Sequence, residues 1–291
     1  MKDCFHYDIR DFQIHLLDVL DALDTVCREH GLTYYLLGGT LLGAVRSGGF
    51  IPWDDDVDVG MMRADYDLLM EHAAEWLPAR YAMVSYMTNP DVSRHFAKLE
   101  DRNTTLVERF HLKKVGGLYV DIFPLDAVPD NVLSRRIHVA RFKYVERLLY
   151  YAYRDPYKHG KGLSAAFYKL IQRCVSKEKL HARLQKIAKE YNGRENCSGV
   201  ITHSSFRPVP AETYGKPALY RFENREYWGP ADAVPYLTIN YGEDYIVPPP
   251  PEKRETHYFQ YCDLDHGYDT ADFDELKTLY KQYMAQKKEA Q

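Results

Sequence analysis

The sequence predicts a mixed α/β (α+β) fold, and three observations lead to this prediction. Apolar residues recur at helical spacing near the N-terminus, in the middle and near the C-terminal end of the chain. Short runs rich in β-branched and aromatic residues, which favour strands, lie between those stretches. At 291 residues, with 45% hydrophobic and 27% charged residues, the chain has the size and composition of a globular protein with a substantial core.

Helices and strands alternate in the first part of the chain. Residues 8–30 carry apolar side chains on one helical stripe, and Gly31 is expected to end this helix. A strand at 33–37 leads into the turn Gly38-Gly39-Thr40, and a short helix at 41–46 follows, with Thr40 near its N-cap. The next expected elements are a strand at 57–59, a helix at 63–76, and strands at 81–86, 96–99 and 118–123.

The later part of the chain is first helical and then irregular. Long basic helices are expected at 131–153 and 162–191, and a polar helix at 270–288 closes the chain. After Gly199, frequent Pro, Gly and aromatic residues predict loops and short strands. We expect one compact unit with three parts: a catalytic core over 1–128, a helical insertion over 129–195 and a C-terminal segment over 196–291 that packs on the core.

Charge and cysteine content restrict the class of function. The net charge of −4 gives no general attraction to polyanions, so we expect no nucleic-acid partner. The five cysteines are odd in number, widely spaced and without a CxxC pair, which indicates free thiols in a reducing compartment. The N-terminus lacks the apolar core of a signal peptide, and no apolar run approaches the about 18 residues of a membrane span. We therefore expect a cytoplasmic protein.

Four aspartates within positions 54–58 form the most informative segment. Side chains alternate along a strand, so Asp56 and Asp58 are expected on one face and the intervening valines on the other. Neighbouring like charges repel, which favours a cation between them, and carboxylate oxygens suit Mg²⁺ or Mn²⁺. A solvated acidic turn is the alternative interpretation.

A further acidic residue lies inside the apolar strand expected at 118–123. Asp121 should project from the face opposite the aliphatic side chains of that strand. A carboxylate in such a setting costs stability when it is buried without a partner. Either a basic residue pairs with Asp121, or Asp121 joins Asp56 and Asp58 in a metal site.

Other residues are candidates for contacts to a phosphate group. The Gly38-Gly39-Thr40 turn precedes a helix, where glycines permit close approach of a ligand and the first backbone amides bind anions. Arg46, at the end of that helix, contacts a phosphate or carboxylate or else forms a structural ion pair. Lys98 alternates with apolar neighbours and either binds phosphate in the same cleft or lies on a solvated strand edge.

Four segments make the sequence resemble a known family. They are GGTLLGAVRSGGFIPWDDDVDV (38–59), AKLEDRNTT (97–105), GLYVDIFPLD (117–126) and YLTINYGEDYIVPPPPEKRETH (236–257). The chain resembles the LicD family of phosphotransferases, which belongs to the nucleotidyltransferase-fold superfamily and has fukutin and fukutin-related protein as distant relatives. The resemblance implies a nucleotidyltransferase-like mixed-sheet core with a helical insertion and a C-terminal return. It also implies that Asp56 and Asp58 bind metal with Asp121 as third acid, and that 38–40 cradles phosphate.

The resemblance further implies an activity. It would be metal-dependent transfer of a phospho-alcohol, phosphocholine above all, from a CDP-alcohol to a sugar hydroxyl, with release of CMP. The acceptor would be a glycan or lipid-linked glycan, a precursor of cell-surface polysaccharide or teichoic acid, so the protein would act at the inner face of the membrane with peripheral contact. A true nucleotidyltransferase that releases pyrophosphate, and a non-catalytic binding or scaffold protein, are the alternatives.

Aromatic and basic side chains are candidates for contacts to the two substrates. A choline head group is held by aromatic faces, and the candidates are Trp53, Tyr119, Trp228, Tyr241 and Tyr245. The basic residues after the proline run at 248–251 are Lys253, Arg254 and His257. They either face the acceptor or fasten the C-terminal segment across the core.

Overall fold

A computed structural model describes residues 4–5, 7–154, 163–254 and 259–289. A curled mixed sheet lies at its centre, in the order β1-β2-β5-β4-β10, with β3 paired to β4, β6 paired to β5, and β7 paired to β6. Its strands are β1 (Tyr35–Leu36), β2 (Asp58–Met62), β3 (Tyr81–Val84), β4 (Ala97–Val107), β5 (Gly116–Val128), β6 (Gly199–Ile201), β7 (Val209–Pro210) and β10 (Tyr261–Asp263). A separate hairpin is formed by β8 (Ala218–Phe222) and β9 (Arg225–Gly229).

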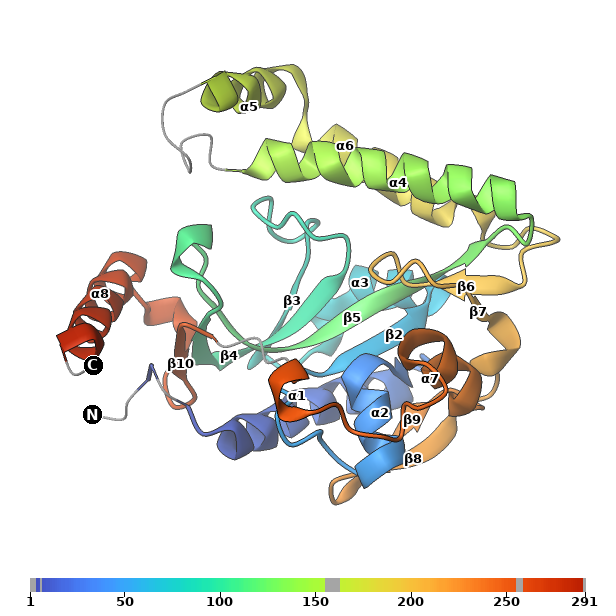
Figure 1. Ribbon diagram of the computed structural model, residues 1–291, viewed down its shortest axis with the longest axis horizontal. Helices are drawn as coiled ribbons and strands as arrows, with labels where there is room; N and C mark the ends of the chain where they lie inside the picture. The colour runs from blue at the N-terminus through green and yellow to red at the C-terminus, as the bar shows by residue number, and fades with distance from the viewer. Residues whose placement is uncertain (1–3, 6, 155–162, 255–258, 290–291) are drawn as a thin grey trace.

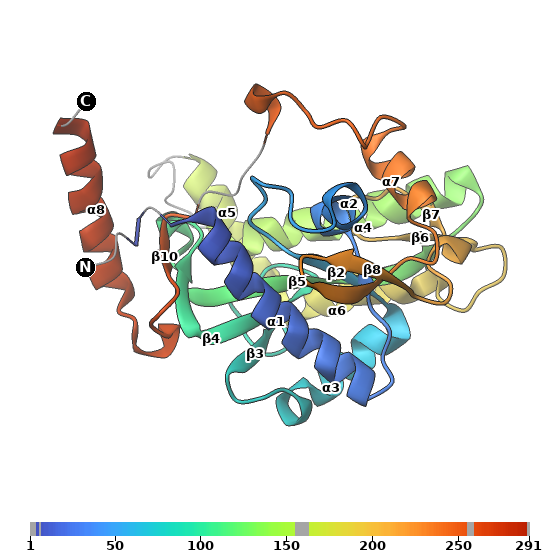
Figure 2. The same ribbon diagram turned by 90° about the horizontal axis from the view of Figure 1, so that it is seen from below.

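The helices lie on both sides of this sheet. They are α1 (Ile9–Glu29), α2 (Gly38–Ser47), α3 (Arg63–Trp76), α4 (Val132–Tyr153), α5 (Leu163–Cys174), α6 (Lys177–Ala188), α7 (Ala233–Tyr241) and α8 (Phe273–Glu289). Figures 1 and 2 show α1 across one face of the sheet and the pair α4 and α6 on the opposite side. None of the helices in the described ranges is long and apolar enough to cross a bilayer.

The predicted α+β fold class is confirmed, and the local reasons can be followed in α1. Its N-cap is Asp8, whose side chain accepts hydrogen bonds from the amides of Arg10 and Asp11. Its apolar stripe is buried in a core shared with the sheet, and Gly31 follows the helix with φ +67°. Glycine adopts this left-handed conformation without a steric penalty.

The helical part has a small apolar core of its own. Phe142, Val145 and Leu149 of α4 pack with Leu184 and Ile187 of α6. The division of the chain at residues 128 and 195 stays a prediction. The C-terminal segment returns to the sheet, since β10 pairs with β4 in antiparallel fashion.

Two sequence expectations for the later part of the chain are wrong. The single helix expected over 162–191 is broken after Cys174, because Ser176 caps a new helix by accepting a hydrogen bond from the amide of Lys179. The region after Gly199 contains α7, which Asp232 caps at the amide of Val234. The five cysteines are free thiols, as expected.

The segment after the proline run at 248–251 contacts Trp53, which directly precedes the four aspartates within 54–58. The guanidinium of Arg254 stacks over the ring of Trp53, with 4.1 Å to the ring centroid. This cation–π contact supports the interpretation that Arg254 fastens the C-terminal segment to the core. His257 lies outside the described residues.

Candidate active site

Asp58, Asp121 and Lys98 lie in one row across three neighbouring strands. The parallel pair β2 and β5 places Asp58 opposite Asp121, and the antiparallel pair β5 and β4 places Asp121 opposite Lys98. Neighbouring strands are about 4.8 Å apart, so side chains on the same face of such a row are close neighbours. The Lys98 Nζ lies 3.7 Å from Asp121 Oδ1. The structure therefore brings these three sequence-predicted residues together.

The acidic loop before β2 continues the alternation of the strand. Asp54, Asp56 and Asp58 are partly exposed, whereas Asp55 and Val57 between them are buried. The carboxylate of Asp55 is held on the other side by the hydroxyl of Tyr7, at 2.9 Å. Asp54, Asp56 and Asp58 therefore lie on the face of the sheet that carries Asp121 and Lys98, whereas we predicted only Asp56 and Asp58 there. The signal for Asp54 was present in the sequence, as an alternation that begins two residues earlier.

The two glycines before β2 allow the acids to approach the start of α2. Gly38 has φ +53°, and a Cβ on it would lie 2.3 Å from Asp58 Oδ2. A Cβ on Gly39 would lie 2.4 Å from Asp54 Oδ2. No side chain larger than hydrogen fits at either position unless the carboxylates move. The acids and the first turn of α2 therefore border the same space.

The expectation that Thr40 caps a helix beginning at Leu41 is wrong. The helix α2 begins at Gly38, with Leu37 at the N-cap position. Thr40 lies within the first turn, and its Oγ1 accepts a hydrogen bond of 2.9 Å from the amide of Asp58. This bond fixes the start of β2 against α2, which positions the Asp58 side chain. A phosphate contact of Gly38, Gly39 or Thr40 stays a prediction.

The grouped carboxylates disfavour one another's ionised form. Desolvation raises the pKa of Asp58 well above its usual range, and the negative charges of Asp56 and Asp121 raise it further. Desolvation also raises the pKa of Asp121 to about 6, although the positive charges of Lys98 and Arg94 oppose the shift. A bound cation would relieve this repulsion.

The carboxylates of the site offer the oxygen ligands that a divalent cation needs. Asp121 Oδ1 is buried and has no hydrogen-bond partner among the described residues. In the same part of the chain, no group of three or more His, Cys, Asp or Glu side chains is arranged to hold an ion by itself. Mg²⁺ commonly takes only one or two carboxylates and completes its shell with substrate phosphates and water. The residues present fit a cation bound in that way.

Lys98 and Arg46, the two basic candidates for phosphate contacts, neighbour different acids, Asp121 and Asp54. Lys98 is 4% exposed, donates a 2.8 Å hydrogen bond to Glu108 and lies over the ring of Tyr119, so the solvated-edge interpretation is wrong. Arg46 lies in the last turn of α2, where burial lowers its pKa and the negative charge of Asp54 raises it. Phosphate binding by either residue stays a prediction.

Two tyrosines of α7 border Asp58. Tyr236, Tyr241 and Phe123 line a cavity of about 370 Å³ together with Gly38 and Asp58. The hydroxyl of Tyr236 accepts a 2.9 Å hydrogen bond from the amide of Gly38. The remaining lining residues are mostly polar: Leu37, Thr202, Ser204, Ser205, Arg207 and Asn240.

The aromatic residues that we considered are spread over different places. Tyr241 lines the cavity beside Asp58, whereas the ring of Tyr119 contacts the ammonium group of Lys98. Trp228 packs under the guanidinium of Arg28, at 4.3 Å, and is part of the scaffold. Sequence reasoning missed Tyr236 as a site residue, although it begins the fourth family-like segment.

Comparisons with known proteins agree with these motifs. Residues 31–150 match the family model described as LicD/FKTN/FKRP, nucleotidyltransferase domain. The chain is 25% identical over 272 residues to lipopolysaccharide cholinephosphotransferase LicD of Haemophilus influenzae, which covers 87% of this chain and 96% of that protein. It is 42% identical over 57 residues to ribitol 5-phosphate transferase FKRP of Homo sapiens, which covers 20% of this chain and 10% of FKRP. Residues 31–150 therefore resemble the nucleotidyltransferase domain of the LicD family, and the similarity to a LicD cholinephosphotransferase extends over most of the chain, as its motifs predicted.

Proposed function

We propose that this enzyme transfers phosphocholine from CDP-choline to a hydroxyl of a cell-surface glycan precursor and releases CMP. The observation that carries the proposal is the convergence of Asp56, Asp58 and Asp121 beside a cavity lined by Tyr236 and Tyr241. The similarity to a cholinephosphotransferase over most of both chains supports it. A nucleotide donor and a membrane-linked acceptor would place the reaction at the cytoplasmic face of the membrane.

Asp56 and Asp58 are the proposed ligands of one or two Mg²⁺ or Mn²⁺ ions. Such an ion, when bound, neutralises the diphosphate of the donor and stabilises the charge that develops on the leaving CMP. The amides at the start of α2, with Arg46 and Lys98, are proposed to hold the phosphate oxygens. These contacts orient the donor so that its choline-side phosphorus faces the acceptor.

Asp121 is the proposed base. The acceptor oxygen forms a bond to the choline-side phosphorus, and the bond from that phosphorus to the bridging oxygen breaks. The electron pair of the broken bond leaves with CMP. The proton of the acceptor hydroxyl passes to Asp121, whose pKa of about 6 leaves it ionised at neutral pH and still basic enough to accept a proton. Completion of the metal shell is the second role that Asp121 can fill.

The cavity beside Asp58 is the proposed site of the donor head group. The rings of Tyr236 and Tyr241 can hold a trimethylammonium group by cation–π attraction, at about 0.5–2 kcal/mol for each ring. Hydroxyl and amide groups of Thr202, Ser204 and Asn240 line the same cavity and suit a polyol. Together with the similarity to a ribitol 5-phosphate transferase, they make transfer of a polyol phosphate the second candidate function.

A panel of donors tests the proposal. The purified protein is incubated with CTP or with the CDP derivatives of choline, ethanolamine, glycerol or ribitol, in Mg²⁺ or Mn²⁺, and CMP and pyrophosphate are measured. We expect metal-dependent CMP release, fastest from CDP-choline. Fastest release from CDP-ribitol or CDP-glycerol would favour the polyol. Pyrophosphate release from CTP would favour a true nucleotidyltransferase, and the absence of both products would favour a binding protein.

A further inference from the structure

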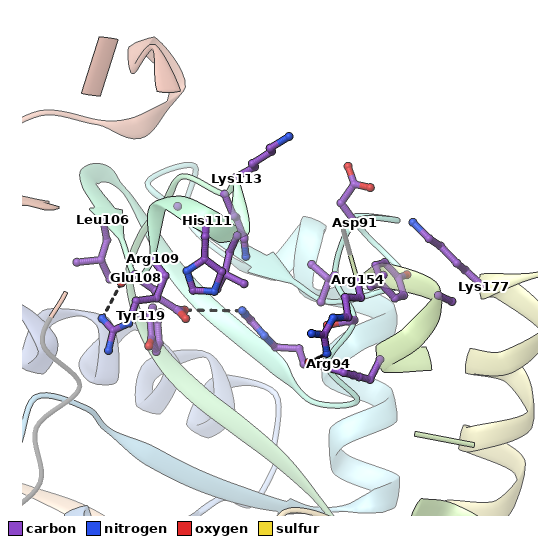
Figure 3. Close-up of a pocket in the computed structure, with 18 of the residues that line it drawn as sticks. Asp91, Arg94, Leu106, Glu108, Arg109, His111, Lys113, Tyr119, Arg154 and Lys177 are labelled. Atoms are coloured by element: carbon purple, nitrogen blue, oxygen red, sulfur yellow. Dashed lines mark hydrogen bonds and ion pairs between the residues drawn. The ribbon is translucent and has the colours of Figure 1, made fainter. Parts of the chain in front are cut away.

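A larger cavity, of about 650 Å³, lies at the Lys98 end of the row formed by Asp58, Asp121 and Lys98 (Figure 3). Its walls come from the loop 91–94, from the hairpin that joins β4 and β5, and from the facing ends of α4, α5 and α6. The charged side chains that line it comprise six cations and three anions: Arg94, Arg109, Lys113, Lys114, Arg154 and Lys177 against Asp91, Glu100 and Glu108. On a chain with a net charge of −4, this cavity is a local concentration of positive charge.

Two guanidinium groups in the wall have unused donors. Arg94 Nη1 and Arg154 Nε are buried and have no hydrogen-bond partner among the described residues. One other nitrogen of each side chain has a partner: Arg154 Nη1 donates to the Tyr150 hydroxyl at 2.7 Å, and Arg94 Nη2 lies 3.7 Å from Glu108. A buried N–H group without a partner is costly, so each arginine gains stability when a rotation of its guanidinium group brings that donor to a ligand in the cavity.

The side chain of Lys98 links the wall of this cavity to Asp121, the proposed base. Glu108 and Tyr119 belong to its wall, and both contact Lys98, at 2.8 Å and at 3.1 Å to the ring centroid. Lys98 Nζ in turn lies 3.7 Å from Asp121. The cavity beside Asp58 lies on the Gly38 side of the same row. The two cavities therefore approach the carboxylates from different sides, as a donor and an acceptor must.

We propose that the larger cavity is the acceptor site and that Arg94 and Arg154 bind a phosphate group carried by the acceptor glycan. This inference rests on the proposed function. A guanidinium group can donate two parallel hydrogen bonds to a pair of the tetrahedrally arranged phosphate oxygens, and the negative charge of a phosphate complements the positive charge of the cavity. A neutral sugar would leave the excess positive charge unbalanced. The phosphate is either a substituent of the sugar or the diphosphate that joins a glycan to a lipid.

Calorimetric titration in EDTA tests binding apart from catalysis, because chelation removes any cation that could bind phosphate at the carboxylates. The probes are galactose 1-phosphate, geranyl diphosphate and galactose. We expect saturable binding of at least one phosphorylated probe and none of galactose. The preferred probe identifies the source of the phosphate. Absence of binding by both phosphorylated probes would overturn the inference.

Variants locate the binding. Arg94→Gln and Arg154→Gln should each weaken the phosphorylated probe by about 10-fold or more, since each removes a charge-assisted hydrogen bond. Lys177→Gln, a change at a partly exposed lining residue that the core does not need, should weaken it several-fold even if an arginine variant fails to fold. The matched control is Arg136→Gln, on the exposed surface of α4 and outside the cavity, which should bind as the wild type does. Wild-type affinity in the folded lining variants would contradict the assignment.

Kinetics separate this inference from the proposed function. In Arg154→Gln, the KM for a phosphorylated acceptor should rise about 10-fold, whereas the KM for CDP-choline should stay within about 2-fold. Phosphate binding that the lining variants weaken, in a protein that releases no CMP from any donor, would support the anion site and reject the transferase. CMP release without phosphate binding in EDTA would support the transferase and reject the anion site.

Discussion

Asp58 on β2 and Asp121 on β5 lie directly opposite each other in a parallel strand pair, although 62 positions separate them in the chain. The register of the two strands alone makes them neighbours. A slip of one residue would turn one carboxylate to the opposite face of the sheet, where the apolar core lies. The amide of Asp121 donates to the carbonyl of Val57 at 2.9 Å as part of this pairing, and the hydrogen bond from the amide of Asp58 to Thr40 holds the start of β2 against α2.

Asp121→Asn distinguishes the two roles of this residue. If Asp121 accepts the proton, turnover should fall by about 10²–10⁴-fold, affinity for Mn²⁺ should change little, and added metal should not restore activity. If it is mainly a ligand, Mn²⁺ affinity should weaken and excess metal should restore part of the activity. Titration of Mn²⁺ and of CMP release on the same sample measures both. Wild-type turnover at low metal would remove Asp121 from the site.

Gly38→Ala should reduce both stability and activity. A side chain at φ +53° costs about 1–2 kcal/mol of folding free energy, and the new Cβ would displace the Asp58 carboxylate from a distance of 2.3 Å. Gly31→Ala is the matched control, because Gly31 has φ +67° and nothing within 4 Å of an added Cβ. We expect both variants to unfold at lower denaturant concentration and only Gly38→Ala to lose CMP release. Equal activity of the two would show that the approach of Asp58 to Gly38 has no role.

Two buried histidines should make stability depend on pH. Burial lowers the pKa of His95 to about 4 and lowers that of His203 well below its usual range, and the positive charge of Arg63 adds to both shifts. The unfolded chain binds these protons near pH 6.5, so their stabilising contribution is complete above that pH and declines as pH falls toward 4.

The expected loss is about 2 kcal/mol for His95 between pH 6.5 and pH 5, and the change at His203 has the same direction. The raised pKa values of Asp58 and Asp121 act in the opposite direction, so the wild type alone is a poor reporter. Urea unfolding of the wild type and of His203→Gln at pH 7.5 and pH 5 isolates the contribution of His203 to the free energy of unfolding. The difference in free energy between the two proteins should shift in favour of the variant at pH 5, and a constant difference would refute the assignment.

Tyr241→Leu tests the choline assignment. Loss of one ring should raise the KM for CDP-choline by about 2–30-fold, in line with about 0.5–2 kcal/mol for a cation–π contact. The KM for CDP-glycerol should change less, since glycerol carries no cation. Tyr144→Leu, at an exposed tyrosine of α4 outside both cavities, is the control. An equal rise for both donors would leave the transferase in place and reject choline as its alcohol.

The sequence predicted those parts of the site that depend on local periodicity. Alternation along an extended segment is local, so the shared face of Asp56 and Asp58 could be read without a structure. The pairing of Lys98 with Asp121 depends on strand register, which no local pattern contains. The same is true of the larger cavity, whose Arg94 and Arg154 come from distant segments.

There are physical reasons why the sequence did not predict α7 or the break between α5 and α6. The segment of α7 is rich in tyrosine and β-branched residues and contains Pro235, all of which argue against a helix by propensity. The cap at Asp232 and the packing of Tyr236 and Leu237 into the core outweigh that preference. The break between α5 and α6 was missed because Ser176 lies within a continuous helical pattern.

The comparison of Asp58→Asn with the wild type tests the central claim most directly. Asparagine keeps the size of the side chain but removes the charge that a cation needs, and it also removes a carboxylate whose raised pKa reports unfavourable ionisation. CMP release from CDP-choline and thermal unfolding in EDTA are measured on both proteins. We expect the variant to lose nearly all metal-dependent CMP release and to unfold in EDTA at the same temperature or a higher one. Full turnover in the variant, or its unfolding at a much lower temperature, would contradict a metal-binding role for this carboxylate.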